Sequence, residues 1–126
     1  MDSAKKKVLV IDDNPDIGDL VERALEGSEF EVFKASGGRE GIHMAQEQRP
    51  DIILLDIMMP ELDGFTVSNY LKIIPEAGSI PIIFLTARAT NSGRMIAIKA
   101  GAVDYIVKPF SPKELLKRLQ RIINTM

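Results

Sequence analysis

Four short apolar runs without polar alternation constrain the fold of this chain more than any other feature. The runs are rich in β-branched and aromatic side chains, which is typical of strands buried on both faces of a sheet. A fifth segment, residues 30–34, alternates partly between apolar and charged side chains, as expected of a strand at a sheet edge. The four apolar runs are residues 8–11, 52–55, 82–85 and 105–107.

Segments with helical periodicity separate the predicted strands. The clearest covers residues 17–25, and a second, over residues 115–123, follows a Ser111 N-cap and Pro112 at the first helical position. The alternation of strand and helix, repeated five times, predicts an α/β fold: a doubly wound parallel sheet with right-handed crossovers and helices on both faces. Weaker helical patterns occupy residues 37–48, 64–74 and 91–100.

The composition favours a single domain over residues 1–126 and excludes several functional classes. With 16 Lys and Arg against 18 Asp and Glu, the net charge of −2 gives no basic field for a polyanion, so we expect no direct binding of nucleic acid. The chain has no Cys, which excludes disulfides and thiolate metal sites. The first apolar run is too short for a signal peptide or a membrane span. We therefore expect a soluble, cytoplasmic protein without membrane attachment.

Chemically useful side chains follow four of the predicted strands. Asp12 and Asp13 follow the first strand, Asp56 the third, Thr86 the fourth and Lys108 the fifth. Each residue alone has an ordinary structural explanation, such as a turn, a helix cap or a solvated charge. Because parallel strands deliver their carboxyl ends to one edge of a sheet, all five should meet in a single cleft. We therefore interpret them jointly as one site.

The predicted cleft favours a divalent cation and a phosphate. Two unit charges 4 Å apart repel by about 4 kcal/mol at an effective dielectric constant of 20, so three carboxylates require either raised pKa values or a bound cation. An all-oxygen site with few protein ligands suits Mg²⁺. A neighbouring Lys108 ammonium and a Thr86 hydroxyl could hold an incoming anion.

The chain resembles the receiver domain of two-component response regulators from Lys7 to Ile123. Four motifs carry the resemblance: VLVIDDNPDI, DIILLDIMMPELDGF around Asp56, PIIFLTA at Thr86 and GAVDYIVKPFSPKELL around Lys108. The resemblance implies a flavodoxin-like sheet of five strands in the order 2-1-3-4-5, with five helices.

The resemblance implies a phosphoacceptor and a set of metal ligands. Asp56 would accept the phosphoryl group. Asp13, Asp56 and the backbone carbonyl of Met58 would bind Mg²⁺, and Asp12 would act on the ion directly or through water.

The resemblance also implies a switch around the phosphoryl group. Lys108 would pair with the phosphoryl group, Thr86 would move to bond it, and Tyr105 would turn inward into the space that Thr86 leaves. The peptide bond before Pro109 would be cis, and Gly64 would serve the tight turn that opens the third helix.

The implied partners are proteins of a signalling pathway. The phosphodonor would be a histidine kinase, a phosphotransfer protein or a small high-energy phosphate, and the recipient of the signal an effector domain or protein. The domain would catalyse its own modification and turn over no external substrate. Its switching face would be the fourth helix, fifth strand and fifth helix, where a homodimer is a further possibility. The charged positions for such a dimer are Arg94, Asp104, Glu114 and Arg118.

Three other functions remain alternatives. A phosphorylation-independent, degenerate receiver ranks second, although none of the key residues is missing. An aspartyl phosphohydrolase would carry a second Asp two residues after Asp56, where Met58 stands, and an FMN binder would be disfavoured by repulsion between its phosphate and Asp12 and Asp13.

Met58 and Arg88 occupy positions that in the receiver family influence the access of water to the phosphoryl group. We hypothesise that the bulky Met58 slows hydrolysis, with simple packing as the alternative.

Overall fold

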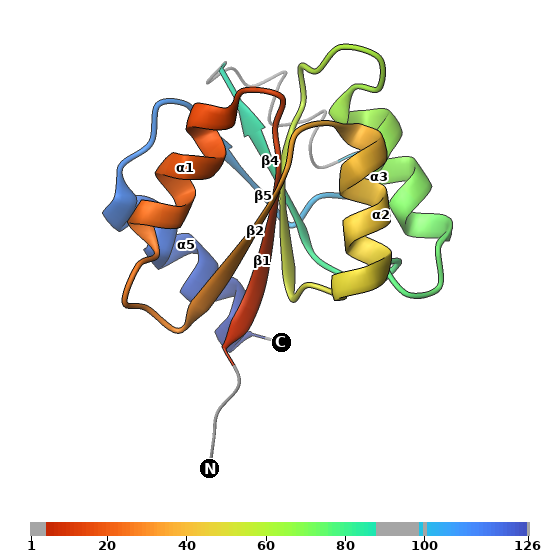
Figure 1. Cartoon of the computed structure of the whole chain (residues 1–126). Coiled ribbons are helices and arrows are strands. Elements are labelled where there is room, and N and C mark those ends of the chain that lie inside the picture. Colours follow the sequence, from red (N-terminus) through yellow and green to blue (C-terminus); the bar gives the residue numbers. More distant parts are fainter. Residues whose placement is uncertain (1–4, 88–98, 100, 126) are drawn as a thin grey trace.

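The computed structural model describes residues 5–87, 99 and 101–125, and strands and helices alternate along it (Figure 1). The helix predicted over residues 91–100 lies almost entirely outside this part, so the described residues contain four helices where five were predicted. The longest of the described helices, α5, has 13 residues. No described helix could cross a lipid bilayer. The strands are β1 (Lys6–Ile11), β2 (Phe30–Ala35), β3 (Ile52–Asp56), β4 (Ile82–Thr86) and β5 (Asp104–Val107); the helices are α1 (Pro15–Ala24), α2 (Gly38–Gln48), α3 (Gly64–Ile73) and α5 (Pro112–Asn124).

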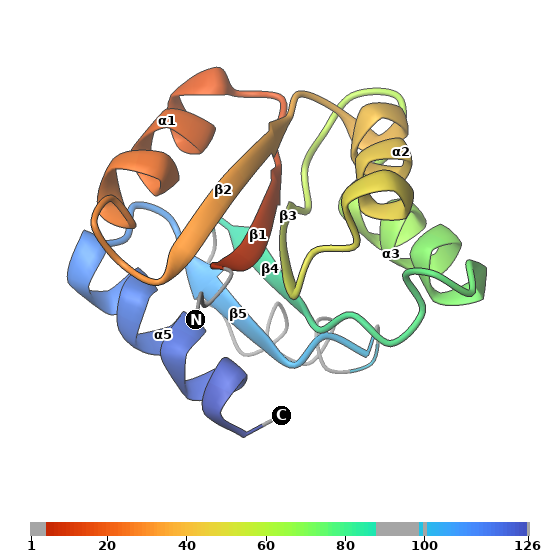
Figure 2. The ribbon, with the colours of Figure 1, turned by 60° about the horizontal axis from the view of Figure 1, so that its bottom comes forward.

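The five strands form one parallel sheet in the order β2-β1-β3-β4-β5. This arrangement confirms the predicted doubly wound sheet and its strand order. α1 and α5 cover one face, and α2 and α3 cover the other (Figures 1 and 2). The adjacent interior strands β1 and β3 thus have helices on both sides.

Two apolar clusters, one on each face, hold the helices to the sheet. In β1, Val8 and Val10 belong to the cluster under α1 and α5, whereas Leu9 and Ile11 belong to the cluster under α2 and α3. All four side chains are at most 1% exposed, which explains why the sequence of this strand shows no polar alternation. In the edge strand β2, by contrast, Glu31 and Lys34 are exposed.

Side-chain caps mark where α1 and α5 begin. Asn14 caps α1 by accepting a hydrogen bond from the Asp16 amide, and Ser111 caps α5 by accepting one from the Glu114 amide. Both helices have Pro at the first helical position, as predicted for α5. Because α1 begins directly after Asn14, only Asp12, Asp13 and Asn14 join β1 to it, which holds the two acids at the carboxyl end of the sheet.

Candidate functional site

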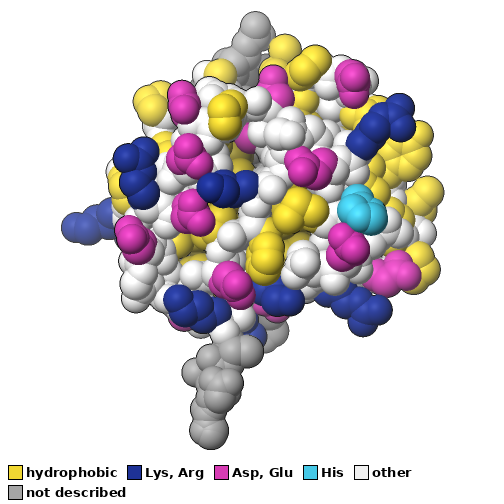
Figure 3. All heavy atoms as spheres, in the orientation of Figure 1, with side chains coloured by type: hydrophobic (Ala, Val, Ile, Leu, Met, Phe, Trp, Pro, Cys, Tyr) yellow, Lys and Arg dark blue, Asp and Glu magenta, His cyan; other side chains and the backbone are white. Residues whose placement is uncertain are grey.

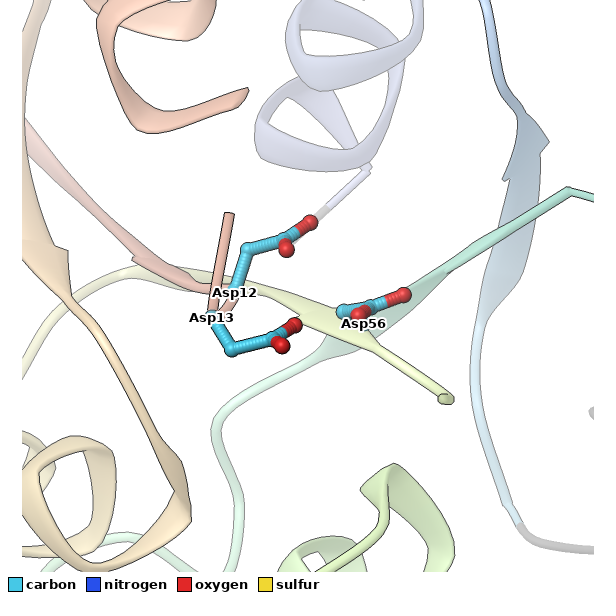
Figure 4. A group of neighbouring side chains, drawn as sticks. All are labelled: Asp12, Asp13 and Asp56. Atoms are coloured by element: carbon cyan, nitrogen blue, oxygen red, sulfur yellow. The ribbon is translucent and has the colours of Figure 1, made fainter. Parts of the chain in front are cut away.

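Three carboxylates converge at the carboxyl ends of β1 and β3, which are adjacent in the sheet. Asp12 and Asp13 follow β1, and Asp56 is the last residue of β3, its neighbour in the sheet. One oxygen from each carboxylate lies within 4.8 Å of the others, and Figure 4 shows the three side chains pointing into a shared space. Asp12 and Asp56 are only 4% and 5% exposed, whereas Asp13 is open to solvent. The three acids thus form one site.

Lys108, which follows the edge strand β5, bridges the two buried acids. Its Nζ lies 2.8 Å from Asp12 Oδ2 and 3.2 Å from Asp56 Oδ1. Within the described residues, Asp13 takes part in no ion pair. One ammonium therefore faces three carboxylates, and the site keeps an excess of negative charge.

The pKa of the Asp56 carboxyl is raised above its ordinary value. Burial is the largest cause, and the charge of Asp12 raises this pKa further, while Lys108 only partly offsets the rise. Burial by itself lowers the pKa of the Lys108 ammonium, but its hydrogen bond to Asp12 and the charges of Asp12 and Asp56 outweigh burial and raise that pKa. The cluster thus holds Lys108 charged, while ionisation of Asp56 remains costly.

The donor set fits a hard divalent cation. The three acids supply only oxygen atoms, and the exposure of Asp13 leaves room for water on the metal. Mg²⁺ prefers oxygen ligands, keeps several waters and is commonly bound through one or two carboxylates. A cation here would also offset the repulsion that raises the pKa of Asp56. These residues therefore suit Mg²⁺.

Hydrogen bonds fix the orientation of Asp12. Its Oδ1 accepts a bond of 3.0 Å from the Asn14 amide, and its Oδ2 accepts the bond from Lys108. Both oxygens of Asp12 therefore already have a donor. Asp13 and the second oxygen of Asp56 are more available to a ligand.

Thr86 and Tyr105 lie on the neighbouring strands β4 and β5. The Thr86 carbonyl accepts a 2.7 Å hydrogen bond from the Lys108 amide, so the two candidate residues are adjacent across the sheet edge. Tyr105 pairs with Phe84 in the strand register and packs, half-buried, against the cluster under α2 and α3. Lys108 and Pro109 are joined by a cis peptide bond, the isomer that the resemblance implies.

The loop from β3 to α3 packs closely against the backbone of Asp56. A Cβ added to Gly64 would collide with the Asp56 carbonyl oxygen and lie 2.8 Å from the Ile57 Cα. The Gly64 amide donates a 2.8 Å hydrogen bond to the Ile57 carbonyl. The resemblance implies a tight turn at this glycine but does not predict the close approach to Asp56. The Met58 side chain, on the same loop, is 78% exposed.

Three of the four charged positions considered for a dimer bond to each other within the chain. Arg118 Nη1 donates to Asp104 Oδ1 at 2.9 Å and to the Tyr105 carbonyl at 2.8 Å, and its Nη2 lies 3.6 Å from Glu114. The spacing of Glu114 and Arg118 by four residues was the only sequence signal for this network. Arg94 and Arg88 lie outside the described residues.

Residues 8–120 match the family model described as the response regulator receiver domain. The chain belongs to this family. Receiver domains are phosphoryl-accepting signalling domains, and response regulators interact with histidine kinases and with downstream effectors. The match runs from within β1 through most of α5 and so includes the whole candidate site.

Known receiver domains and regulators resemble this one over nearly its whole length. The probable transcriptional regulator ycf27 of Cyanophora paradoxa is 41% identical over 98% of this chain and 50% of its own length. The chain therefore spans about half the length of the curated relatives it matches. The chemotaxis protein CheY4 of Vibrio cholerae is 36% identical with a TM-score of 0.87, over 94% of this chain and 98% of CheY4.

A second similar structure contains a magnesium ion. The receiver domain of the sensor histidine kinase PA1611 from Pseudomonas aeruginosa is described with magnesium coordinated in its active site cleft. It is 34% identical to this chain with a TM-score of 0.83, over 94% of this chain and 97% of that domain.

Proposed function

We propose that this receiver domain accepts a phosphoryl group on Asp56 and that Asp12, Asp13, Asp56 and the backbone carbonyl of Met58 serve a Mg²⁺ ion. The observation that carries the proposal is the contact of one Lys108 ammonium with two buried acids beside a third, exposed acid. When bound, Mg²⁺ would neutralise charge on the phosphoryl oxygens and on the acids around it.

In the proposed transfer, an Asp56 carboxylate oxygen forms the new bond to phosphorus. The bond from phosphorus to the donor, such as the imidazole nitrogen of a phosphohistidine, breaks in line with it, and its electron pair returns to that nitrogen. This chemistry needs positioning and charge neutralisation more than covalent help. The backbone contact of Gly64 with Asp56 supports such positioning, because it fixes the carbonyl next to the acceptor side chain.

Lys108 and Thr86 would respond to the new charge. A phosphoryl group adds roughly two negative charges, and the Lys108 ammonium, already held charged by its neighbours, would form an ion pair with it. The Thr86 hydroxyl would donate a hydrogen bond, and Tyr105 would turn inward. Moving a two-state domain from 1:99 to 99:1 takes about 5.5 kcal/mol, which a few charge-assisted hydrogen bonds can supply.

We propose that residues 1–126 form a single receiver domain with proteins as its partners. A histidine kinase or a phosphotransfer protein would donate the phosphoryl group, and an effector domain or protein would receive the signal. The net charge of −2 supports protein partners over nucleic acid. Since kinases take their phosphate from ATP, the cytoplasm is the proposed location.

Homodimerisation after phosphorylation is a finer proposal. Asp104, Glu114 and Arg118 would have to exchange their bonds within the chain for bonds between two copies. Sedimentation of the protein with Mg²⁺ and a phosphoryl mimic tests this, and a monomer under those conditions would contradict it.

The function itself is tested by intact-mass spectrometry after incubation with acetyl phosphate. We expect a gain of one phosphoryl group that requires Mg²⁺, disappears with chelation and is absent from Asp56→Asn. The matched control is Asp16→Asn, an exposed acid on α1 that should still be labelled. Failure of the wild-type chain to gain mass, while another receiver domain labels in parallel, would favour a phosphorylation-independent interaction domain. Repeated turnover of a phosphate ester would favour a phosphohydrolase.

A further inference from the structure

The side chain of Met58 is an apolar group that folding leaves in solvent next to the candidate site. It is 78% exposed, whereas the next residue, Met59, is 9% exposed and belongs to the cluster under α2 and α3. Met44, on α2, is half-buried against the same cluster. At the carboxyl end of the sheet, near the top of Figure 3, hydrophobic side chains lie exposed beside acidic ones. Burial of apolar surface therefore does not explain Met58.

The loop from β3 to α3 holds Met58 in this exposed place. Before it, the Ile57 amide donates a 3.2 Å hydrogen bond to the Leu85 carbonyl, and the Ile57 carbonyl accepts the bond from the Gly64 amide. After it, the Met59 side chain is packed in the core. Since both neighbours of Met58 are fixed, its thioether stays accessible to small molecules in water.

Met58 is also close enough to Asp56 to affect a group bound there. Two residues of chain span at most about 7 Å, so the Cα atoms of Met58 and Asp56 lie within that distance. The methionine side chain is long and flexible. The sulfur of Met58 is therefore within reach of a phosphoryl group on Asp56.

The thioether of Met58 can be converted by an oxidant into a group of different chemistry. The chain has no Cys, so no thiol competes with methionine for a peroxide. One oxygen of hydrogen peroxide bonds to the sulfur as the O–O bond breaks, so the sulfur is oxidised and the peroxide is reduced to water. The sulfoxide formed is polar, and its oxygen accepts hydrogen bonds that a thioether accepts only weakly.

We propose that Met58 is an oxidation site and that its sulfoxide shortens the lifetime of the phosphoryl group on Asp56. The proposal rests on the proposed function, since this effect requires a phosphorylated Asp56. The sulfoxide oxygen accepts a hydrogen bond from a water molecule and holds it next to the phosphorus. The water oxygen bonds to phosphorus, the bond from phosphorus to the Asp56 oxygen breaks, and its electron pair returns to the carboxylate. Inorganic phosphate leaves with both protons of the water.

The first measurement locates the oxidation, in protein without Mg²⁺ and without a phosphodonor. After brief treatment with hydrogen peroxide, tandem mass spectrometry of peptides should find more sulfoxide at Met58 than at Met59 or Met44, because exposure of the sulfur governs its oxidation. Oxidation of Met58 no faster than that of Met59 overturns the proposal. This result does not depend on whether Asp56 accepts a phosphoryl group.

The second measurement follows the decay of a radiolabelled phosphoryl group in treated and untreated protein. Treated wild type should lose the label about fivefold faster, the effect of one hydrogen bond of about 1 kcal/mol. Methionine sulfoxide reductases, one for each epimer, should restore the slower decay. Met58→Leu keeps an apolar side chain of similar size without the sulfur, so peroxide should not change its decay rate.

The matched control is Met44→Leu, which removes a thioether from α2 and should respond to peroxide like the wild type. The proposal is overturned if treated and untreated wild type decay at the same rate, or if peroxide accelerates decay in Met58→Leu as much as in wild type. A chain that takes up no label at all contradicts the proposed function instead, and the peptide measurement then decides the oxidation site.

Discussion

The interior of β1 and β3 buries only apolar side chains, whereas their carboxyl ends bury acids. Within β3, Ile53 and Leu54 are completely buried among apolar neighbours, whereas Asp56, at the end of the same strand, is buried next to two other acids. The interior gains free energy from every buried methylene group, while the end retains charges that burial disfavours. The comparison teaches that stability and the proposed chemistry occupy adjacent residues of one strand, and substitutions should separate them.

The largest expected effect belongs to the interior. Leu54→Ala removes a fully buried side chain from the cluster under α1 and α5 and should lower the free energy of unfolding by about 3 kcal/mol. Ile73→Ala, at a position that is 76% exposed, should change it by less than about 0.5 kcal/mol. Urea denaturation measures both, and similar losses would contradict the assignment of the core.

The next effect concerns the only cation that contacts the acids among the described residues. Lys108→Ala leaves Asp12 and Asp56 buried without their ammonium partner and should lower the free energy of unfolding by about 1 to 3 kcal/mol without Mg²⁺. Mg²⁺ should restore part of this loss. Lys6→Ala, an exposed lysine at the start of β1, is the control. A Lys108→Ala protein as stable as the wild type would show that the contacts of Lys108 with Asp12 and Asp56 do not stabilise the fold.

At the strand ends, removal of a charge should stabilise the protein. Asp13→Asn reduces the repulsion around Asp56 and should raise the free energy of unfolding by about 1 kcal/mol in the absence of metal. The same change should weaken Mg²⁺ binding, measured by calorimetry, whereas Asp16→Asn, which removes an exposed charge from the first turn of α1, should leave Mg²⁺ binding unchanged and should not raise the free energy of unfolding. If Asp13→Asn destabilised the metal-free domain, the three acids would not form a mutually repelling cluster.

The contrast between apolar strand interiors and acidic strand ends could largely be predicted from the sequence. The apolar runs indicated the strands, and the residue after each run indicated the site, because the parallel topology gathers strand ends at one edge. The contacts made there were less accessible. Lys108 and Asp12 are 96 residues apart and meet only once the sheet is formed, so the sequence did not reveal that Lys108 lies closer to Asp12 than to Asp56.

Two further features depended on tertiary packing. The close approach of Gly64 to the Asp56 carbonyl depends on how α3 packs against the sheet. The pairing of Arg118 with Asp104 joins α5 to β5 within the chain, whereas the resemblance implies that both residues could contact a second copy.

The pH dependence of the free energy of unfolding tests the burial of charge at the end of β3. The folded-state pKa of Asp56 is raised, mainly by burial, so its ionisation favours the unfolded chain. In metal-free protein, the stability of wild type relative to Asp56→Asn should be greatest at low pH, where both states are protonated. That relative stability should fall as the pH rises above the ordinary value of 3.8 and through the raised pKa. Urea denaturation across this range measures the difference, and a constant difference would contradict the burial of an uncompensated charge.

The smallest expected effect is on the lifetime of the phosphorylated domain. Met58 lies on the loop after Asp56 with its side chain exposed, and we expect its bulk to hinder the approach of water. Met58→Asn should therefore lose its phosphoryl group faster than wild type, by a factor measurable in a radiolabel decay assay. A decay equal to or slower than wild type would refute this role and leave packing as the explanation.

The central claim, that Asp12, Asp13, Asp56 and Lys108 act as one site for a cation and a phosphoryl group, is tested most directly by a crystal structure with Mg²⁺ and a phosphoryl mimic. The account predicts an ion about 2.0 to 2.1 Å from carboxylate oxygens of Asp13 and Asp56 and from the Met58 carbonyl, with the mimic on Asp56 and Lys108 against it. An ion bound elsewhere, or Lys108 directed away from the mimic, would contradict the account.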